Sequence, residues 1–342
     1  MSRRSTIAIL LLAVIALAVT GCGGSNKKAG KSGAKKLKIG LVTDIGQLND
    51  RGFNHLAFLG LKRAEHQFGA QGRVFQSNSA AEYIPNLSRF AQLGYDLVIG
   101  VGFTEQPAMN AVATKFPNTH FSIVDVSNAD LPSRPKNVVG LLFKEQEVGY
   151  LAGYLAGLEV KRLPGPDIVS SVGGQKQPPV DRFIAGYQAG AKKADPGVQV
   201  FNGYSQEWVD QSKCKELALN QIARGSRIVF QVAGNCGLGV LDAAKEKGVW
   251  AIGVDADQSY LGPQVLTSAT KGVDTAVFDT IKAVKDGTFK GGRDDVFGLT
   301  RDGVGLGKIS SKVPKSAVEA VHKVRNEIVA GKIKNIPTRV AG

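Results

Sequence analysis

Hydrophobic and polar residues alternate along the chain in two distinct patterns. Short runs rich in valine and isoleucine are typical of buried strands, and they occur at residues 37–42, 73–76, 97–101, 120–124, 168–172, 198–201, 228–232 and 249–254. Longer stretches with helical periodicity lie between or after them, at residues 53–68, 87–93, 148–158, 180–193, 211–224, 238–247 and 274–285. This alternation predicts an α/β fold in which helices cover parallel sheets.

The order of these elements also predicts how the chain divides. Two sets of alternating strands and helices follow one another, with a break at about residues 130–145, which indicates two similar lobes. The length agrees with this division, because 342 residues exceed what one hydrophobic core usually organises.

Polar residues gather directly after several of the predicted strands. Three of them are aspartates, Asp44, Asp125 and Asp255. In open parallel sheets the carboxyl ends of the strands border the ligand crevice, so these side chains are candidates for one shared polar pocket. Helix capping and turn formation explain most aspartates at such junctions, and for each of the three they are an equal alternative.

The start of the chain carries a continuous apolar run instead of an alternating pattern. Arg3 and Arg4 precede apolar residues 7–19, and small residues lead into Cys22. This arrangement predicts a signal peptide over residues 1–21 and a lipid on Cys22, which anchors the mature protein at the extracytoplasmic face of the cell membrane. The run is shorter than the roughly 18 residues of a membrane span. The alternative is a secretory signal whose cysteine is incidental.

Residues 22–36 are predicted to form a flexible, lysine-rich tether, because they include no large apolar residue. The lysines either attract an anionic lipid surface or are simply solvated. The whole chain has a net charge of +14; loss of Arg3 and Arg4 leaves 41 of its 43 basic residues against 29 acidic ones, or +12. The basic residues are spread out and form no basic-aromatic motif, so nucleic acid is not an expected partner.

Two cysteines remain beyond the lipidation site, in a compartment that permits disulfides. Cys214 lies early in a predicted helix, and Cys236 lies in the loop after the next predicted strand. Neighbouring parallel elements could bring the two together, so a disulfide between Cys214 and Cys236 is a candidate that depends on their geometry.

Four ordered motifs resemble the basic membrane protein family, the lipoprotein substrate-binding proteins of ABC importers, of which the best understood members take up purine nucleosides. The motifs are TDIGQLNDRGFNHLAFLGL (residues 43–61), VGGQKQPPVDRFIAGYQAGAK (172–192), VAGNCGLGVLDAAKEKGVWAIGVDADQ (232–258) and GKIKNIP (331–337). The resemblance implies two Rossmann-like lobes joined by hinge strands, a periplasmic-binding-protein type I architecture with the ligand in the interlobe cleft. The implied N-terminal lobe spans residues 37–143 and about 269–296, and the C-terminal lobe residues 144–268 and about 297–342.

The first motif implies part of a ligand site. By family resemblance, Asp44 and Asn49 lie in the first ligand loop, where Asp44 accepts hydrogen bonds from a base edge. Either Asn49 or Asp50 is then expected to cap the following helix. Phe53 fits the family's stacking aromatic, and a core position in the first turn of the helix is the alternative.

The opposite lobe is expected to supply a second ring. Trp208, in a loop where relatives tend to carry phenylalanine, is the preferred candidate, and Phe230 inside a predicted strand is better explained by core packing. Gly234 follows that strand and would let backbone groups approach the ligand.

Two carboxylates and a lysine complete the implied ligand set. Asp125 and Asp255 match the family's strand-end carboxylates, which hold ribose hydroxyls. A ligand without hydroxyl groups would leave a buried carboxylate oxygen without a hydrogen-bond donor. Lys271 matches a family lysine that reaches the pocket and compensates the aspartates, with a surface position as the alternative.

Other functions find less support in the sequence. The four histidines lie in no GxSxG or HExxH motif, and Asp255 and Asp257 lack further carboxylates at supporting spacing, so we expect no enzyme, no metal and no cofactor. We expect a monomer that binds a nucleoside, most of all a purine, and delivers it to an ABC permease. A ligand-sensing lipoprotein and a binder of another hydroxylated aromatic compound such as riboflavin remain alternatives, and a nucleoside hydrolase is a weaker one.

Overall fold

The computed structural model describes residues 36–340. The predicted signal peptide, Cys22 and all but the last residue of the predicted tether lie outside the described residues. The described residues belong to one compact unit. Among their helices, none has both the length and the apolar content that a membrane crossing requires.

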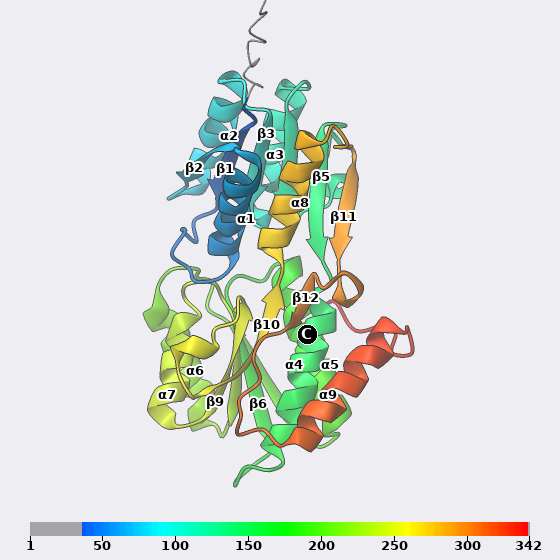
Figure 1. Ribbon diagram of the computed structural model, residues 1–342. Coiled ribbons are helices and arrows are strands. Elements are labelled where there is room, and N and C mark those ends of the chain that lie inside the picture. Colours follow the sequence, from blue (N-terminus) through cyan, green and yellow to red (C-terminus); the bar gives the residue numbers. More distant parts are fainter. Residues whose placement is uncertain (1–35, 341–342) are drawn as a thin grey trace, which may run out of the picture. The chain divides into compact units, whose positions relative to one another are not determined.

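The first sheet is built from the first part of the chain and one later strand. In order across the sheet, its parallel strands are β2 (Gln71–Gln76), β1 (Lys38–Thr43), β3 (Leu97–Val101), β4 (His120–Val124), β5 (Val138–Phe143) and β11 (Arg293–Phe297). One face is covered by α1 (Phe53–Phe68) and α8 (Val273–Lys285), the other by α2 (Tyr83–Gln92) and α3 (Gln106–Lys115). We call this sheet and its helices the N-lobe, drawn above the second sheet in Figure 1.

The second sheet repeats the same strand order. Its strands are β7 (Gln199–Tyr204), β6 (Ile168–Gly173), β8 (Ile228–Val232), β9 (Trp250–Asp255), β10 (Val265–Lys271) and β12 (Val304–Leu306), of which only β12 is antiparallel to its neighbour. One face is covered by α4 (Glu145–Val160) and α5 (Pro178–Ala194), the other by α6 (Gln211–Ala223) and α7 (Leu238–Lys247). Helix α9 (Lys315–Val329) packs against α4. We call this sheet and its helices the C-lobe.

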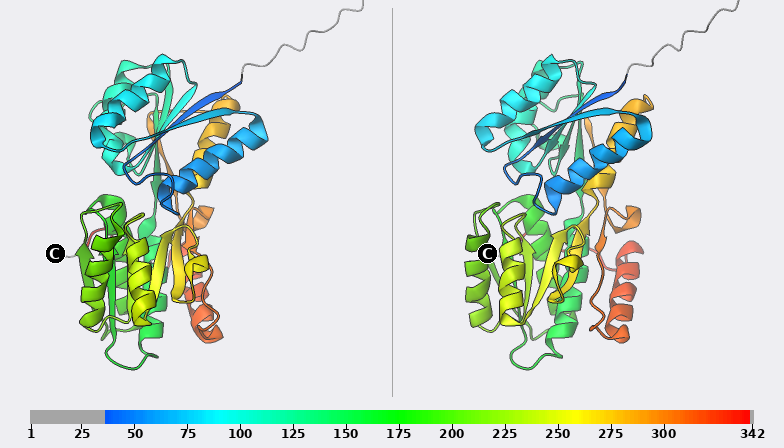
Figure 2. Two further views of the ribbon diagram at one scale, coloured as in Figure 1. Left: turned by 90° about the vertical axis from the view of Figure 1, so that its left-hand side faces the viewer. Right: turned by 60° about the vertical axis from the view of Figure 1, so that its left-hand side comes forward.

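Five short 3-10 helices lie in the described connections: η1 (Ala80–Glu82), η2 (Phe103–Glu105), η3 (Asn128–Asp130), η4 (Ser259–Leu261) and η5 (Leu299–Arg301). The chain passes between the lobes at three places, from β5 into α4, from β10 into α8 and from β11 into β12. Figure 2 shows these connections side by side between the two lobes. Short connections of this kind can absorb the backbone rotation of a hinge between two lobes.

Burial of aliphatic side chains on both faces explains why the central strands form. Every residue of β3 and of β8 is buried, as is typical of central strands in parallel sheets. On β1, Ile39 and Leu41 face α1 and α8, whereas Val42 faces α2 and α3. Each fully buried side chain of this size contributes about 1.5–3 kcal/mol to stability.

Helices α4 and α5 lie unusually close because glycines form their contact. Gly149, Gly153 and Gly157 recur at a spacing of four along α4, and Gly186 and Gly190 do so along α5. A Cβ atom on any of these glycines would overlap a backbone carbonyl oxygen of the facing helix. The glycine spacing therefore sets the distance between α4 and α5 and the positions of the side chains that these helices carry.

The predicted α/β fold class with two lobes is confirmed, and the predicted strands and helices are present with shifts at their ends. The predicted break at residues 130–145 contains strand β5, and the first passage between the lobes, from β5 into α4, lies at its end. Helices α3 and α9 and strands β5, β10, β11 and β12 are not among the predicted elements. Strand β12 is short, β11 is largely polar and α3 has a proline in its first turn, so periodicity does not reveal them. Helix α9 has buried apolar residues at helical spacing, and the sequence interpretation missed this signal.

Candidate functional site

A cavity lies where the carboxyl ends of the strands of the two lobes face each other. It holds about 580 Å³ of empty space, part of it open to solvent. Seven of the eight ligand-binding residues expected from the sequence line it: Asp44, Phe53, Asp125, Trp208, Gly234, Asp255 and Lys271.

Asn49 is the eighth expected residue, and the structure places it elsewhere. Its side chain is exposed and it does not line the cavity. The neighbouring Asp50 is buried and caps α1 instead, because its carboxylate accepts hydrogen bonds from the backbone N–H groups of Gly52, Asn54 and His55 at 2.8–3.1 Å. Of the two capping candidates, Asp50 performs this role.

Asp44 follows β1 and is held in place by its own loop. Its Oδ1 accepts hydrogen bonds from the backbone N–H of Gly46 at 2.9 Å and from Nδ2 of Asn54 at 2.8 Å. Burial raises the pKa of Asp44 to about 6, against these two hydrogen bonds, which lower it. The carboxyl group therefore lies in the cavity as a fixed hydrogen-bonding group whose charge depends on pH near neutrality.

Lys271 is at the centre of a buried ion-pair network that joins the lobes. It ends β10 of the C-lobe, and its Nζ lies 2.7 Å from the carboxylate of Asp125 on the N-lobe and 2.9 Å from Oε1 of Glu145 at the start of α4. Glu145 in turn accepts a 2.5 Å hydrogen bond from Nε of Arg182 on α5. Lys271 and Glu145 are almost completely buried, so neither charge can be left without a partner.

The network favours the charged forms of Lys271 and Glu145. Burial lowers the pKa of Lys271, but Asp125 and Glu145 outweigh it, and the net shift is upward. Burial likewise raises the pKa of Glu145, yet Lys271 and Arg182 shift it below its ordinary value. The sequence alternative of a surface position for Lys271 is therefore wrong, since its side chain is 2% exposed.

Asp125 and Asp255 occupy equivalent positions in the two lobes, one after β4 and the other at the end of β9. Both have a left-handed backbone, with φ of 70° and 63°. This conformation costs about 1–3 kcal/mol in non-glycine residues and is concentrated at functional sites. It also directs both carboxylates toward the interlobe cavity that they line.

Asp255 differs from Asp125 because no hydrogen bond reaches its carboxylate from any of residues 36–340. Burial raises its pKa to about 7, and the nearby Lys271 only partly offsets this effect. A buried carboxylate without donors is the group that gains most from a ligand hydroxyl.

Aromatic rings line the cavity from both lobes. Phe53 begins α1 in the N-lobe, and Trp208 comes from the loop after β7 in the C-lobe. Nζ of Lys271 lies 5.0 Å from the centre of the Phe53 ring. Phe230, the second candidate from the sequence, is fully buried in β8 and packs on Phe183 and Tyr187, so it belongs to the core.

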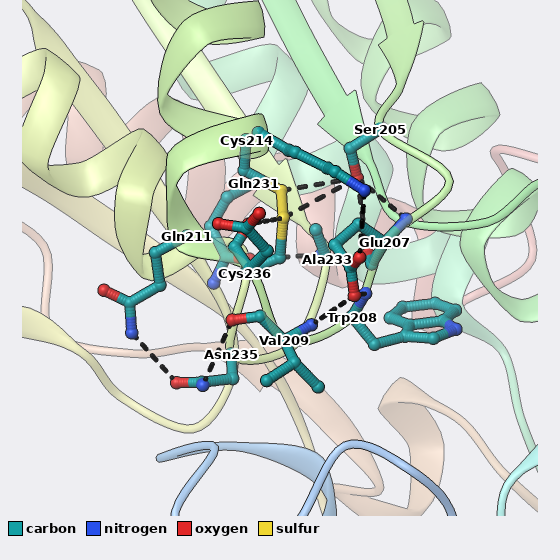
Figure 3. Close-up of a disulfide and its surroundings, with 12 residues drawn as sticks. Ser205, Glu207, Trp208, Val209, Gln211, Cys214, Gln231, Ala233, Asn235 and Cys236 are labelled. Atoms are coloured by element: carbon teal, nitrogen blue, oxygen red, sulfur yellow. Dashed lines mark hydrogen bonds and ion pairs between the residues drawn. A yellow bond between two sulfur atoms is a disulfide. The ribbon is translucent and has the colours of Figure 1, made fainter. Parts of the chain in front are cut away.

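Trp208 fits into space left by Gly174 and lies beside Gly234. Figure 3 shows its indole directed away from the Cys214–Cys236 disulfide. A Cβ atom on Gly174 would lie 2.5 Å from Cζ3 of the ring, and one on Gly234, where φ is 56°, would lie 3.6 Å from Cε3. The indole N–H is buried and has no acceptor among the described residues.

The architecture and the sequence together identify the family. Residues 36–338 match the family described as ABC transporter substrate-binding protein PnrA-like, Bmp. The chain is a member of the Bmp family. The resemblance to basic membrane proteins is thereby confirmed, and this Bmp protein is a substrate-binding protein of an ABC transporter.

Individual relatives support the same assignment. This Bmp protein is 35% identical over 361 aligned positions to the ABC transporter nucleoside-binding protein BmpA of Lactococcus lactis subsp. cremoris, which covers 98% of this chain and 100% of the relative. It is 32% identical to a protein of Pyrococcus horikoshii named an uncharacterized lipoprotein, over 96% and 87% of the two chains. Its fold is similar to the crystal structure of an ABC transporter solute-binding protein from Aeropyrum pernix K1, with a TM-score of 0.80, 26% identity and coverage of 88% and 94%.

Several residues of the Bmp site are not among those expected from the sequence, and four of them illustrate why. Asn54 and Phe183 line the cavity, and Glu145 and Arg182 hold Lys271. Asn54, Arg182 and Phe183 lie inside the quoted motifs, but they are mounted on helices, where the expectation of pocket residues at strand ends does not apply. Glu145 follows β5 in the range that was interpreted as a break.

The two cysteines form a disulfide between α6 and the loop that precedes α7, with their Cα atoms 5.6 Å apart. Both side chains are fully buried in a small cluster with Val172, Val229 and Val240. Among the described residues, no group of three or more histidine, cysteine or acidic side chains could hold a metal ion.

Proposed function

We propose that this Bmp protein binds a nucleoside, most of all a purine nucleoside, between its two lobes and delivers it to an ABC permease. The observation that carries the proposal is the pairing of two kinds of group in one cavity. Phe53 and Trp208 present flat aromatic rings from opposite lobes, and Asp125 and Asp255 present carboxylates beside them. Offset stacking on an aromatic ring adds about 0.5–1.5 kcal/mol to the burial of a flat base.

The carboxylates favour a ligand that has hydroxyl groups. The Asp255 carboxylate receives no hydrogen bond from residues 36–340, and a ribose diol would supply two donors to it. A ligand without hydroxyls would leave this carboxylate buried and unpaired, which costs about 1–3 kcal/mol or more. The buried indole N–H of Trp208 likewise suits a hydrogen-bond acceptor on the ligand.

Contacts from both lobes imply a mechanism for delivery. The ligand can satisfy Phe53 and Asp125 of the N-lobe together with Trp208 and Asp255 of the C-lobe only when the lobes are close. Ligand binding therefore shifts the population toward the closed form, and the permease recognises that form. The ligand leaves unchanged, since we propose no catalysis.

We propose further that a lipid on Cys22 anchors the protein to the extracytoplasmic face of the cell membrane, with residues 22–36 as the tether. The name of the Pyrococcus horikoshii relative supports the lipid anchor. Mass spectrometry of the intact protein from membranes tests it: an unmodified cysteine in the mature chain would contradict the anchor.

A thermal-shift panel tests the ligand class directly. Guanosine, adenosine and inosine are expected to raise the melting temperature, because a ligand that binds only the folded state stabilises it. Uridine, riboflavin and free sugars serve as comparisons, and a larger shift with riboflavin would select that alternative. No shift with any nucleoside contradicts the proposal, and release of free base during incubation would indicate a hydrolase.

A further inference from the structure

The loop that carries Trp208 has little apolar packing of its own. It joins the end of β7 at Tyr204 to the start of α6 at Gln211. Gln206 and Asp210 are exposed, and Glu207 and Val209 are only half-buried. The indole of Trp208 packs against the apolar core and beside Gly174. The rest of the loop has few buried apolar contacts and such loops open at low cost, so further restraints add to this packing in holding the indole.

The disulfide supplies one restraint at the base of this loop. Cys214 lies in the first turn of α6, directly after the loop, and Cys236 lies in the connection from β8 to α7. The backbone N–H of Cys236 donates a 2.9 Å hydrogen bond to the carbonyl oxygen of Trp208. The disulfide therefore links Cys236, which donates a hydrogen bond to the Trp208 backbone, to helix α6, which follows Trp208 in sequence.

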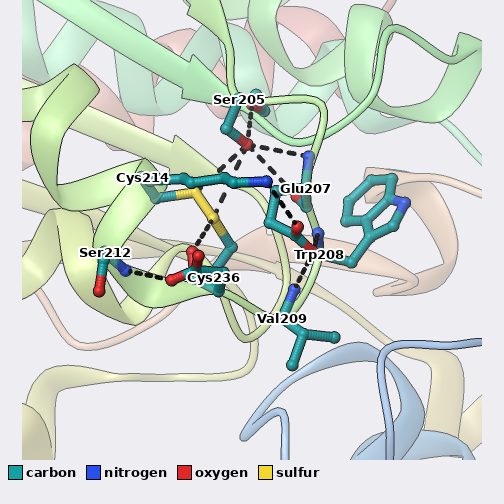
Figure 4. A network of polar contacts seen from close by, with 10 residues as sticks. Ser205, Glu207, Trp208, Val209, Ser212, Cys214 and Cys236 are labelled. Carbon is teal, nitrogen blue, oxygen red and sulfur yellow. Dashed lines mark hydrogen bonds and ion pairs between the residues drawn. A yellow bond between two sulfur atoms is a disulfide. The ribbon is translucent and has the colours of Figure 1, made fainter. Parts of the chain in front are cut away.

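Polar contacts around the sulfur atoms extend this restraint over the whole loop (Figure 4). Oγ of Ser205 lies 3.3 Å from Sγ of Cys214 and 3.7 Å from Sγ of Cys236, and the carbonyl oxygen of Asp210 lies 2.9 Å from Sγ of Cys236. Oε1 of Glu207 accepts hydrogen bonds from the backbone N–H groups of Trp208 at 2.8 Å and of Val209 at 3.0 Å. The first and last residues of the loop thus both contact the disulfide.

We propose that the Cys214–Cys236 disulfide is a positioning element for ligand binding, which holds the Trp208 indole in its ligand-facing position. The proposal rests on the proposed function insofar as Trp208 contacts a nucleoside. A restrained ring loses less conformational entropy when the ligand binds, so preorganisation increases affinity without any contact between sulfur and ligand. The cysteines act through Trp208 and do not touch the ligand.

The chain offers a specific probe for this proposal because it contains two tryptophans, Trp208 and Trp250. Trp250 begins β9 and does not line the cavity, so in a Trp250→Phe protein the fluorescence reports on Trp208 alone. In this background, Cys214→Ala/Cys236→Ala is expected to increase quenching of Trp208 by acrylamide at least about twofold. Guanosine affinity is expected to fall about tenfold, mainly through faster dissociation.

Refolding under reducing conditions gives the same test without a substitution, because the fully buried disulfide is accessible to a reductant only in the unfolded chain. In the urea-unfolded protein, tris(2-carboxyethyl)phosphine and water convert the disulfide to two thiols and the phosphine to its oxide, and the chain is then refolded with the phosphine present. This treatment should reproduce both effects in the Trp250→Phe protein and change nothing in the double alanine variant. Val240→Ala, which removes buried apolar atoms from the same cluster, is the control for lost stability alone, and it should leave the affinity and the quenching unchanged.

The outcomes separate this inference from the proposed function. If the starting protein binds no nucleoside, the proposed function fails, and the acrylamide measurement still tests the restraint on Trp208. If the starting protein binds guanosine and the double alanine variant shows the same affinity and the same quenching, the positioning role is overturned. Equal losses in Val240→Ala and in the double alanine variant would also overturn it.

Discussion

Asp255 and Asp125 show how single residues define the proposed site. Equivalent positions at the ends of β9 and β4 carry the same residue type in the same left-handed conformation. Lys271 forms an ion pair with Asp125, whereas Asp255 is buried without a hydrogen-bond donor from residues 36–340. This asymmetry leaves Asp255 as the carboxylate with most to gain from a ligand.

The raised pKa of Asp255 predicts a distinct dependence of stability on pH. Between the ordinary value of 3.8 and about 7, the folded protein retains a proton that the unfolded chain has released. The contribution of this group is therefore fully present below about pH 4 and is lost as pH rises through about 7. From about pH 5 to about pH 8, the ligand-free wild type should lose on the order of 2 kcal/mol more stability than Asp255→Asn.

Urea unfolding at the two pH values measures this difference. Asp242→Asn, a change at an exposed position on α7, serves as the control and should retain the wild-type pH dependence. Parallel pH profiles for the wild type and Asp255→Asn would show that the carboxyl group of Asp255 is not buried as described.

Glu145 is expected to be essential for stability because it holds two buried cations. Glu145→Gln removes the negative charge that pairs with Lys271 and Arg182 and leaves both cations undercompensated. The loss of one partner from a buried pair typically costs about 3–5 kcal/mol. Thermal and urea denaturation should show a loss of that order, while Glu246→Gln, which breaks only solvent-exposed pairs, should cause no measurable change. Equal stability of wild type and Glu145→Gln would refute the role of the network.

Among the secondary-structure elements, α4 and α5 position several site residues that the sequence did not predict. The glycines at their contact bring the helices together, and these helices carry Glu145, Arg182 and Phe183 to the cavity and to Lys271. Close backbone approach thus connects a sequence pattern to the geometry of the site.

Gly153→Ala tests this close contact. The added Cβ atom would overlap the carbonyl oxygen of Tyr187 on α5, so the helices must separate. Overpacking of this kind costs about 1–3 kcal/mol, which urea denaturation can measure. Gly305→Ala in β12 is the control, because its Cβ atom would approach nothing closer than 3.7 Å. Similar small effects of both substitutions would argue against tight packing of α4 on α5.

The burial of each element determines whether its sequence pattern predicts it. Buried parallel strands such as β4 and β9 have largely apolar sequences, and the rule that strand ends border the ligand crevice leads from them to Asp125 and Asp255. Strand β11, with the sequence RDDVF, lies at a sheet edge and is largely polar, so it has no such signature. Glu145 and Phe183 reach the site only through tertiary packing of helices, which no local pattern encodes.

At the scale of the whole molecule, three connections between the lobes make relative motion of the lobes the expected response to ligand. The ion pair from Lys271 to Asp125 spans the lobes beside the connection from β10 into α8. Phe53 and Trp208 line the same cavity from opposite lobes. A ligand that contacts both rings therefore couples its binding energy to lobe closure.

Isothermal titration calorimetry with guanosine, adenosine and inosine measures the proposed nucleoside binding itself. We expect one saturable site with a Kd of about 1 μM or lower and a negative heat-capacity change. Trp208→Ala and Asp255→Ala should each weaken binding about tenfold or more, and Asn49→Ala, at an exposed position outside the cavity, should bind like the wild type. Absence of binding to all three nucleosides, or wild-type affinity in both Trp208→Ala and Asp255→Ala, would contradict a nucleoside site between the lobes.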